Sequence, residues 1–173
     1  MLYSGTASRL IPMPDGPRYN DDFYAWALYQ AEVLRSMRRI DNRLDREHVA
    51  EEIEDLGKSE KRSIESRIAR IIEHFLKLAY APAHMKSLNQ RGWELSIREA
   101  RRQIRRRLSE SPSLRRKIRE VFPHGYEGGR NAALSALNLP DSALSETSPW
   151  TLEQVLGDSF LPDGQTNSGR SNK

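Results

Sequence analysis

The sequence predicts an all-α protein, a single helical bundle of about five to seven helices with a tail at each end. Apolar residues recur at three- and four-residue spacing through most of the 173 residues, which is the period of an amphipathic helix. Alternating apolar and polar runs bounded by turn residues, which would indicate strands, are not evident in the sequence. A repeat of fixed period is not evident either, so a solenoid is not predicted.

The domain organisation follows from composition along the chain. Residues 1–20 carry Ser, Gly and three prolines, and we expect a flexible N-terminal arm there. Residues 21–162 are predicted to form the helical bundle domain, and residues 163–173 a disordered tail. The sequence has no stretch of roughly 18 apolar residues, and its N-terminus has no apolar signal segment. We therefore expect a cytoplasmic protein that has no membrane partner.

Two helices are predicted in the first third of the domain. The first covers 21–37, because Asp22 can accept hydrogen bonds from free N–H groups at a helix start. The second is shorter and covers 45–56. Gly57 is expected to interrupt it, since glycine disfavours a helix interior.

The third and fourth helices carry the strongest apolar patterns. The third, predicted over 59–79, is the candidate central helix because its apolar residues span a wide arc, and it should end before Pro82. The fourth is predicted over 91–109, with an apolar seam that begins at Trp93. The arc of the third helix consists of Ile64, Ile68, Ile71, Ile72, Phe75 and Leu78.

The positions of prolines and glycines predict where the remaining helices begin and end. Ser111 followed by Pro112 indicates the start of a fifth helix. We expect Pro123 and Gly125 to separate this helix from a sixth over 126–137. The sequence 151–154 has the pattern of a capping box and predicts a short terminal helix.

Acidic residues are concentrated in 51–55, and they suggest one candidate site. Carboxylates three residues apart on a helix suit a hard divalent cation, and a histidine on a neighbouring helix could complete the set. The metal candidates are Glu51, Glu52, Asp55 and His74. The alternative is a solvated acidic face, with His74 packed in the core.

Arginines dominate the region after residue 90 and suggest a second site. Guanidinium groups match phosphate and carboxylate oxygens, so this region is a candidate for phosphate or partner binding. The alternatives are a solvated face, or pairing with the acidic helix within the chain or between copies. The candidate residues are Arg98, Arg101, Arg102 and Arg105.

Composition and motifs restrict the chemistry. The chain has no cysteine, which excludes disulfides, thiolate nucleophiles and cysteine-based metal sites. Its net charge of +4 is too small to establish a nucleic-acid partner. The nucleophile elbow, the Walker loop and the His-Glu-x-x-His motif are all missing from the sequence. No cofactor is predicted, and a divalent metal is the alternative. Because these catalytic motifs are missing, a binding protein is favoured over an enzyme.

Six phrases occur in a characteristic order along the chain. They are 22–26 (DFYAW), 51–57 (EEIEDLG), 74–77 (HFLK), Trp93 with 97–101 (IREAR), 111–114 (SPSL) and 149–154 (PWTLEQ). In this combination the chain resembles the bacterial domain-of-unknown-function family twenty-nine over about 21–162. The resemblance implies an all-helical bundle with no established activity or ligand. It marks the acidic phrase, His74, Lys77 and 97–101 as typical, and the chain departs from it at 123–129.

We therefore expect an interaction or binding module that uses segregated acidic and arginine-rich helices. Its partner would be a protein or a second copy of the chain. The alternatives are a metal-dependent hydrolase of phosphorylated or nucleotide substrates and a weak nucleic-acid binder.

Overall fold

The computed structural model describes residues 16–37 and 43–162, and over these residues it is helical without strands. The predicted all-α class is confirmed. None of the described helices is both long enough and apolar enough to cross a membrane. Residues 16–20 lead into the first helix through a turn, whereas the rest of the predicted arm and the tail at 163–173 lie outside the described residues. The elements are α1 (Phe23–Ser36), α2 (Arg46–Tyr80), α3 (Ala83–Glu110), α4 (Pro112–Leu137), the 3₁₀ turn η1 (Asp141–Ala143) and α5 (Leu152–Leu156).

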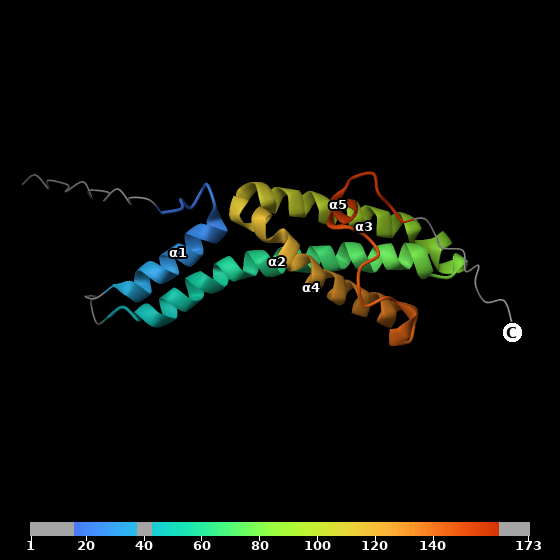
Figure 1. Cartoon of the computed structure of the whole chain (residues 1–173), viewed down its shortest axis with the longest axis horizontal. Helices are drawn as coiled ribbons and strands as arrows, with labels where there is room; N and C mark the ends of the chain where they lie inside the picture. Colours follow the sequence, from blue (N-terminus) through green and yellow to red (C-terminus); the bar gives the residue numbers. More distant parts are fainter. Residues whose placement is uncertain (1–15, 38–42, 163–173) are drawn as a thin grey trace, which may run out of the picture.

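The 35-residue helix α2 is the axis of the fold, about 52 Å long at 1.5 Å per residue (Figure 1). α1 packs on its N-terminal half, whereas α3 and α4 pack on its C-terminal half. As predicted, α2 ends before Pro82, and α3 begins directly after it. After α4 the chain returns over α2 and α3 and carries η1 and α5. We call residues 138–162 the C-terminal segment.

The predicted break at Gly57 is wrong, because α2 continues through it. Gly57 is buried against α1, and a Cβ atom built on it would lie 3.1 Å from the Cβ of Ala27. The glycine therefore serves close packing of two helices and does not end one. Local propensity predicts a weak point here, but the contact with α1 outweighs the cost of about 1 kcal/mol.

The predicted separation of a fifth and a sixth helix is also wrong. α4 is continuous through Pro123, which is exposed, and through Gly125 and Gly129, which are buried against α2. A Cβ atom on Gly125 would lie 2.6 Å from Cγ2 of Ile68. Tertiary packing again uses glycines that local rules assign to a helix boundary.

The fourth predicted helix begins earlier than expected. α3 starts at Ala83, eight residues before the predicted Arg91. Its first turns are exposed and carry no continuous apolar seam, so apolar periodicity does not detect them. The capping box at Thr151 and Gln154 is confirmed, since the Thr151 side chain accepts from Gln154 N–H and the Gln154 side chain accepts from Thr151 N–H.

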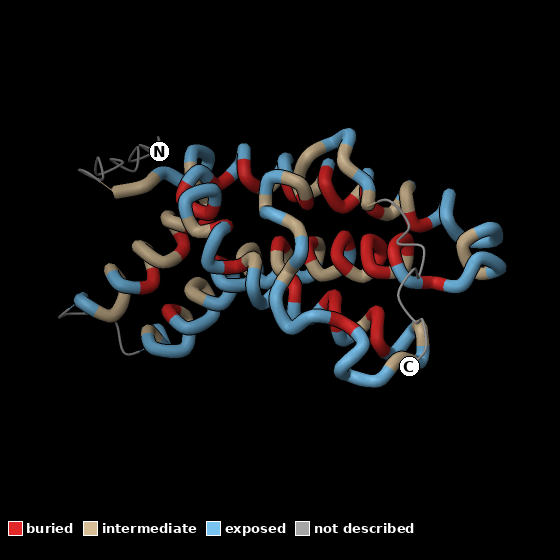
Figure 2. Tube along the Cα trace, turned by 45° about the vertical axis from the view of Figure 1, so that its right-hand side comes forward, coloured by how far each residue is buried: buried red, intermediate tan, exposed pale blue. Residues whose placement is uncertain are grey.

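The hydrophobic core lies between the C-terminal half of α2, α3, α4 and the C-terminal segment (Figure 2). The prediction that residues 59–79 form the central element is confirmed, because all six residues of the predicted arc are buried. Phe75 meets the aromatic rings of the C-terminal segment, with centroid distances of 5.1 Å to Trp150 and 5.6 Å to Phe160. The largest fully buried apolar side chains are Ile64, Ile68, Ile71, Ile72, Phe75, Leu76, Ile97, Ile104, Leu114, Val121 and Val155.

A polar junction attaches α1 to the turn between α3 and α4. Asp22 caps α1 by accepting from Ala25 N–H, and it also accepts from Ser113 N–H at 2.7 Å and from the Ser113 hydroxyl at 2.7 Å. Ser111 occupies the cap position of α4, but its hydroxyl accepts from Tyr24 N–H of α1. The cap residue of each helix therefore accepts a hydrogen bond from a backbone N–H in the first turn of the other helix. These bonds fix the direction in which α1 leaves the core.

Candidate functional site

The structure does not bring the four metal candidates together. Glu51, Glu52 and Asp55 are exposed on the N-terminal half of α2, whereas His74 is buried on its C-terminal half. Asp55 and His74 are 19 positions apart on one continuous helix, about 28 Å along its axis, so they cannot hold the same ion. Over 16–37 and 43–162, His, Asp and Glu form no group of three or more that could hold a metal ion.

One residue of the acidic phrase, Glu54, forms two ion pairs within the chain. Glu54 accepts from Arg35 of α1 at 2.6 Å and from Lys58 at 2.7 Å. These cations lower the pKa of the Glu54 carboxyl. Further along α2, Glu60 pairs with Arg107 of α3 at 2.7 Å. The Glu60–Arg107 pair links α2 to α3, but Glu60 lies outside the predicted acidic helix, so the predicted pairing of that helix with the arginine-rich helices stays a prediction.

His74 is a buried polar side chain without a partner. It is 7% exposed, and both of its ring nitrogens are buried without a hydrogen bond. It lies two turns along α2 from Arg67, whose guanidinium donates to Gln103 of α3, so His74 faces α3. Burial lowers the pKa of His74 to about 4, and the positive charges of Lys77 and Arg70 oppose protonation further, although Glu73 favours it. The ring is therefore neutral at pH 7.

This histidine predicts an acid-sensitive fold. The pKa of the His74 ring is 6.5 in the unfolded chain and about 4 in the folded chain. The unfolded chain therefore takes up a proton first as the pH falls, so the free energy of unfolding is highest above pH 6.5 and decreases below it. We expect His74 to remove about 2 kcal/mol of stability between pH 7 and pH 5. His74→Leu should remove most of this loss, measured by urea unfolding at both pH values.

His84 provides the matched control, because it is an exposed histidine on α3. His84→Gln should retain the acid sensitivity of the original chain. If His74→Leu loses as much stability as the original chain between the two pH values, buried His74 is not the source of the effect.

The four phosphate or partner candidates divide into one buried and three exposed arginines. Arg101 is 1% exposed and points into the protein. Its guanidinium donates to the backbone carbonyls of Gln154, Val155, Asp158 and Phe160 at 2.8–3.3 Å. It also lies over the Phe75 ring, 5.4 Å from the centroid. Arg101 therefore anchors the C-terminal segment and is not available to a ligand.

Arg130 of α4 is a second buried anchor that the sequence analysis missed. It donates to the carbonyls of Asp141, Leu144 and Ser145 and to the Asp141 carboxylate at 2.8 Å. The spacing of apolar residues along α4 does not identify Arg130, because a charged residue in an amphipathic helix is normally expected to face solvent. Two guanidinium groups thus satisfy the carbonyls of a segment that has little secondary structure of its own.

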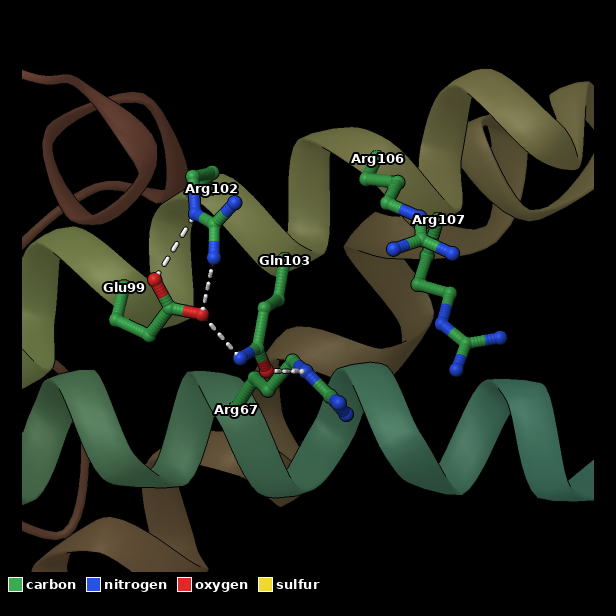
Figure 3. Close-up of a pocket in the computed structure, with 6 residues that line it drawn as sticks. All are labelled: Arg67, Glu99, Arg102, Gln103, Arg106 and Arg107. Atoms are coloured by element: carbon green, nitrogen blue, oxygen red, sulfur yellow. Dashed lines mark hydrogen bonds and ion pairs between the residues drawn. The ribbon is translucent and has the colours of Figure 1, made fainter.

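Arg98, Arg102 and Arg105 are exposed on α3, as the prediction requires. Arg102 pairs with Glu99 at 2.8 Å and Arg105 with Asp158 at 2.5 Å. A groove of about 240 Å³ lies between α2 and α3 beside these residues (Figure 3). The groove is lined by Arg67, Glu99, Arg102, Gln103, Arg106 and Arg107.

Arginines predominate in the lining of this groove, and two of them, Arg106 and Arg107, also pair with Glu110 and Glu60 outside it. Four of its six lining residues are arginines and only Glu99 is acidic. Figure 3 shows that Glu99 bridges Arg102 and Gln103, and that Gln103 in turn accepts from Arg67 across the groove. These contacts link α2 to α3 across the groove. Chemically, it can bind carboxylate or phosphate oxygens.

The outer face of α3 also carries an apolar part, nearer to its N-terminus than the groove. Leu88 is 82% exposed and Leu95 is 52% exposed, and the seven-residue spacing places them on one stripe. Between them, a Cβ atom built on Gly92 would meet no other atom within 4 Å. The late predicted start of this helix explains why Leu88 was missed. Leu95 lies inside the predicted helix but outside its apolar seam, so the pattern gave no reason to select it.

Comparison with known proteins supports the fold and gives no activity. A crystal structure of an alpha-helical protein of unknown function from Rhodospirillum rubrum is similar, with a TM-score of 0.59 and 26% sequence identity. The alignment covers 84% of this chain and 93% of that protein. No curated protein matches the sequence. The model of the family described as domain of unknown function DUF29 matches residues 18–161, and the chain belongs to this family.

Proposed function

We propose that this chain is a protein-binding module, which docks an acidic segment of a partner protein on the outer face of α3. The observation that carries this proposal is the composition of one helix face. Exposed leucines lie at its N-terminal end, and exposed arginines continue it towards its C-terminal end. A partner with apolar side chains beside carboxylates would be complementary to both parts.

The leucines supply the apolar part of the proposed contact. A single exposed leucine is common on protein surfaces, but Leu88 and Leu95 lie two turns apart on the same stripe of α3. Gly92 leaves room between them for a side chain of the partner. Burying two leucines against a partner would contribute about 1.5–3 kcal/mol for each fully buried side chain.

The arginines supply charge and direction. Arg102 and Arg106 continue the same stripe, and their side chains are 73% and 76% exposed. They pair with Glu99 and Glu110 of the same helix. Ion pairs this exposed are weak, so a carboxylate of the partner can replace them with little net cost. Charge complementarity of this kind favours fast and specific association.

A protein partner fits this face better than a nucleic acid does. The residues that line the groove beside α3 include no aromatic side chain on which a base could stack. The exposed leucines add nothing to phosphate binding, whereas they are useful against an apolar side chain. Binding to a duplex through its phosphates is therefore the competing outcome of the test.

The test is photo-crosslinking in the source cell. A photoreactive phenylalanine analogue at Leu95 should give a discrete adduct with a partner protein. The double reversal Arg102→Glu and Arg106→Glu should reduce this adduct by about ten-fold or more, because it replaces attraction by repulsion. The same analogue at Glu127, an exposed residue of α4, provides the control position.

Three results would contradict the proposal. One is equal adducts at Leu95 and Glu127, and another is an adduct that the charge reversal does not change. The third is an adduct that nuclease removes, together with an affinity for duplex DNA that falls steeply with salt. That result would identify the face as a nucleic-acid surface.

A further inference from the structure

The groove between α2 and α3 contains one arginine whose charge is not matched by a carboxylate. Arg67 of α2 is half-buried in the lining of the groove. Its Nε donates to Oε1 of Gln103 at 2.7 Å (Figure 3), and its Nη1 donates to the carbonyl oxygen of Ser63 at 2.8 Å and to the Ser63 hydroxyl. Both partners are neutral. Within 16–37 and 43–162, Arg67 forms no ion pair with an Asp or a Glu.

The other three arginines of the lining each have a carboxylate partner. The pairs have distances of 2.7–2.9 Å and are Arg107–Glu60, Arg102–Glu99 and Arg106–Glu110. Because the charges within each pair cancel, Arg67 leaves the groove with an uncompensated positive charge. A half-buried charge is screened less by water and salt than an exposed one, so it attracts an anion more strongly.

The second terminal nitrogen of Arg67 is available to a ligand. Among the described residues Nη2 donates to no acceptor, and the buried side-chain polar atoms without a partner are confined to the His74 ring. Nη2 is therefore in contact with solvent. Gln103 and Ser63 already hold the other two nitrogens, so the guanidinium plane is fixed before a ligand arrives. Little conformational freedom is then left to lose on binding.

We propose that this groove binds a phosphate group, with Arg67 at the centre of the site and Arg106 and Arg107 beside it. A phosphate monoester carries about −1.5 to −2 charges at pH 7 and has three strong acceptor oxygens. The groove offers guanidinium donors from two directions, since Arg67 lies on α2 and the other arginines lie on α3. A single guanidinium satisfies both oxygens of a carboxylate, whereas several around one opening match a phosphate better.

The size and the acidic residue of the groove are compatible with this ligand. Its volume of about 240 Å³ is several times the roughly 30 Å³ that a water molecule occupies in the liquid, so a phosphate fits together with part of the group that carries it. Glu99 also lines the groove, but its two carboxylate oxygens already accept from Arg102 and Gln103. The phosphate belongs either to a small phosphomonoester or to a phosphorylated side chain of a protein. The inference goes beyond the proposed partner face, which does not include Arg67.

An NMR titration of the ¹⁵N-labelled full chain with inorganic phosphate tests the site. We expect the Arg67 Nε–H and the Gln103 side-chain amide to shift with a Kd of about 1 mM. Sodium chloride at the same ionic strength should not reproduce these shifts. Arg67→Gln, followed through the Gln103 amide, should raise the Kd by about ten-fold or more, because it removes the uncompensated charge.

Arg98→Gln is the matched control, since it removes the same charge from an exposed position of α3 outside the groove lining. It should leave the Kd within about two-fold of the original value. Arg106→Gln is a second variant in the site, which keeps the test valid if Arg67→Gln unfolds the chain. The Arg106 side chain is 76% exposed, so its loss should preserve the helical content by far-UV circular dichroism and still raise the Kd by about three-fold or more.

Two further probes identify the source of the phosphate. Glycerol phosphate that binds ten-fold more tightly than inorganic phosphate would indicate a small phosphomonoester, and a phosphoserine peptide with this advantage would indicate a phosphorylated protein. The proposal is overturned if inorganic phosphate causes no shifts at about 50 mM. It is also overturned if sodium chloride reproduces the shifts, or if Arg67→Gln binds phosphate as tightly as the original chain. The crosslink at Leu95 does not involve Arg67, so each proposal can fail without the other.

Discussion

We expect Gly129→Leu to lower the free energy of unfolding by about 3 kcal/mol or more, because it forces a side chain into a close contact between α2 and α4. A Cβ atom built on Gly129 would lie 2.5 Å from the carbonyl oxygen of Ala69 and 2.6 Å from Cβ of Ile72. Neither atom belongs to the mobile end of a flexible side chain. The two helices would have to separate along the centre of the core to admit the leucine. Urea unfolding followed by far-UV circular dichroism measures this loss.

Gly128 is a matched control, because it is the adjacent glycine of the same helix but is exposed. A Cβ atom there would meet only the Cβ of Ala69 at 3.4 Å, an ordinary contact. Gly128→Ala should therefore raise stability by up to about 1 kcal/mol through helix propensity. If Gly129→Leu unfolds at the same urea concentration as the original chain, the close approach of α4 to α2 is not required for stability.

These glycines also explain where the sequence analysis failed. Gly57 and Gly125 read as interruptions because propensity rules treat each helix alone. In the fold they lie where a neighbouring helix leaves no room for a side chain. A single sequence contains no direct record of that neighbour, which is why two breaks are predicted in helices that are continuous. Only pairwise contacts, which the structure supplies, separate a packing glycine from a terminating one.

The spacing of apolar residues and the local helix-end signals predicted the structure correctly where a residue's burial follows from its own helix. The apolar arc of 59–79 predicted the core side of α2, Pro82 predicted its end, and the sequence 151–154 predicted a capped helix. The candidate sites were harder, because exposure of a polar side chain depends on tertiary packing. Arg102 and Arg101 are adjacent arginines with the same local signal, yet one is exposed and the other is enclosed by the C-terminal segment.

That enclosed arginine gives the other large effect. We expect Arg101→Met to release the C-terminal segment from the core and to lower the free energy of unfolding by about 3 kcal/mol. Methionine fills similar space beside Phe75, but it leaves four carbonyls of residues 154–160 without a donor. Each buried unsatisfied carbonyl costs about 1–3 kcal/mol, so the segment gains by moving into water. Hydrogen exchange of the amides of 152–160 should report this release.

Arg105→Met separates this anchoring role from simple charge attraction. Arg105 lies one turn further along α3 and pairs with Asp158 of the same segment, but both side chains are more than half exposed. Its loss should change the exchange of the segment little, because exposed ion pairs contribute little to stability. In Arg101→Lys the amides of 152–160 should exchange as fast as in Arg101→Met and faster than in the original chain. An ammonium group cannot reach the four carbonyls that a guanidinium group spans. Equal exchange in Arg101→Met and Arg105→Met would show that the segment is held by its apolar contacts with Phe75, and not by hydrogen bonds from Arg101.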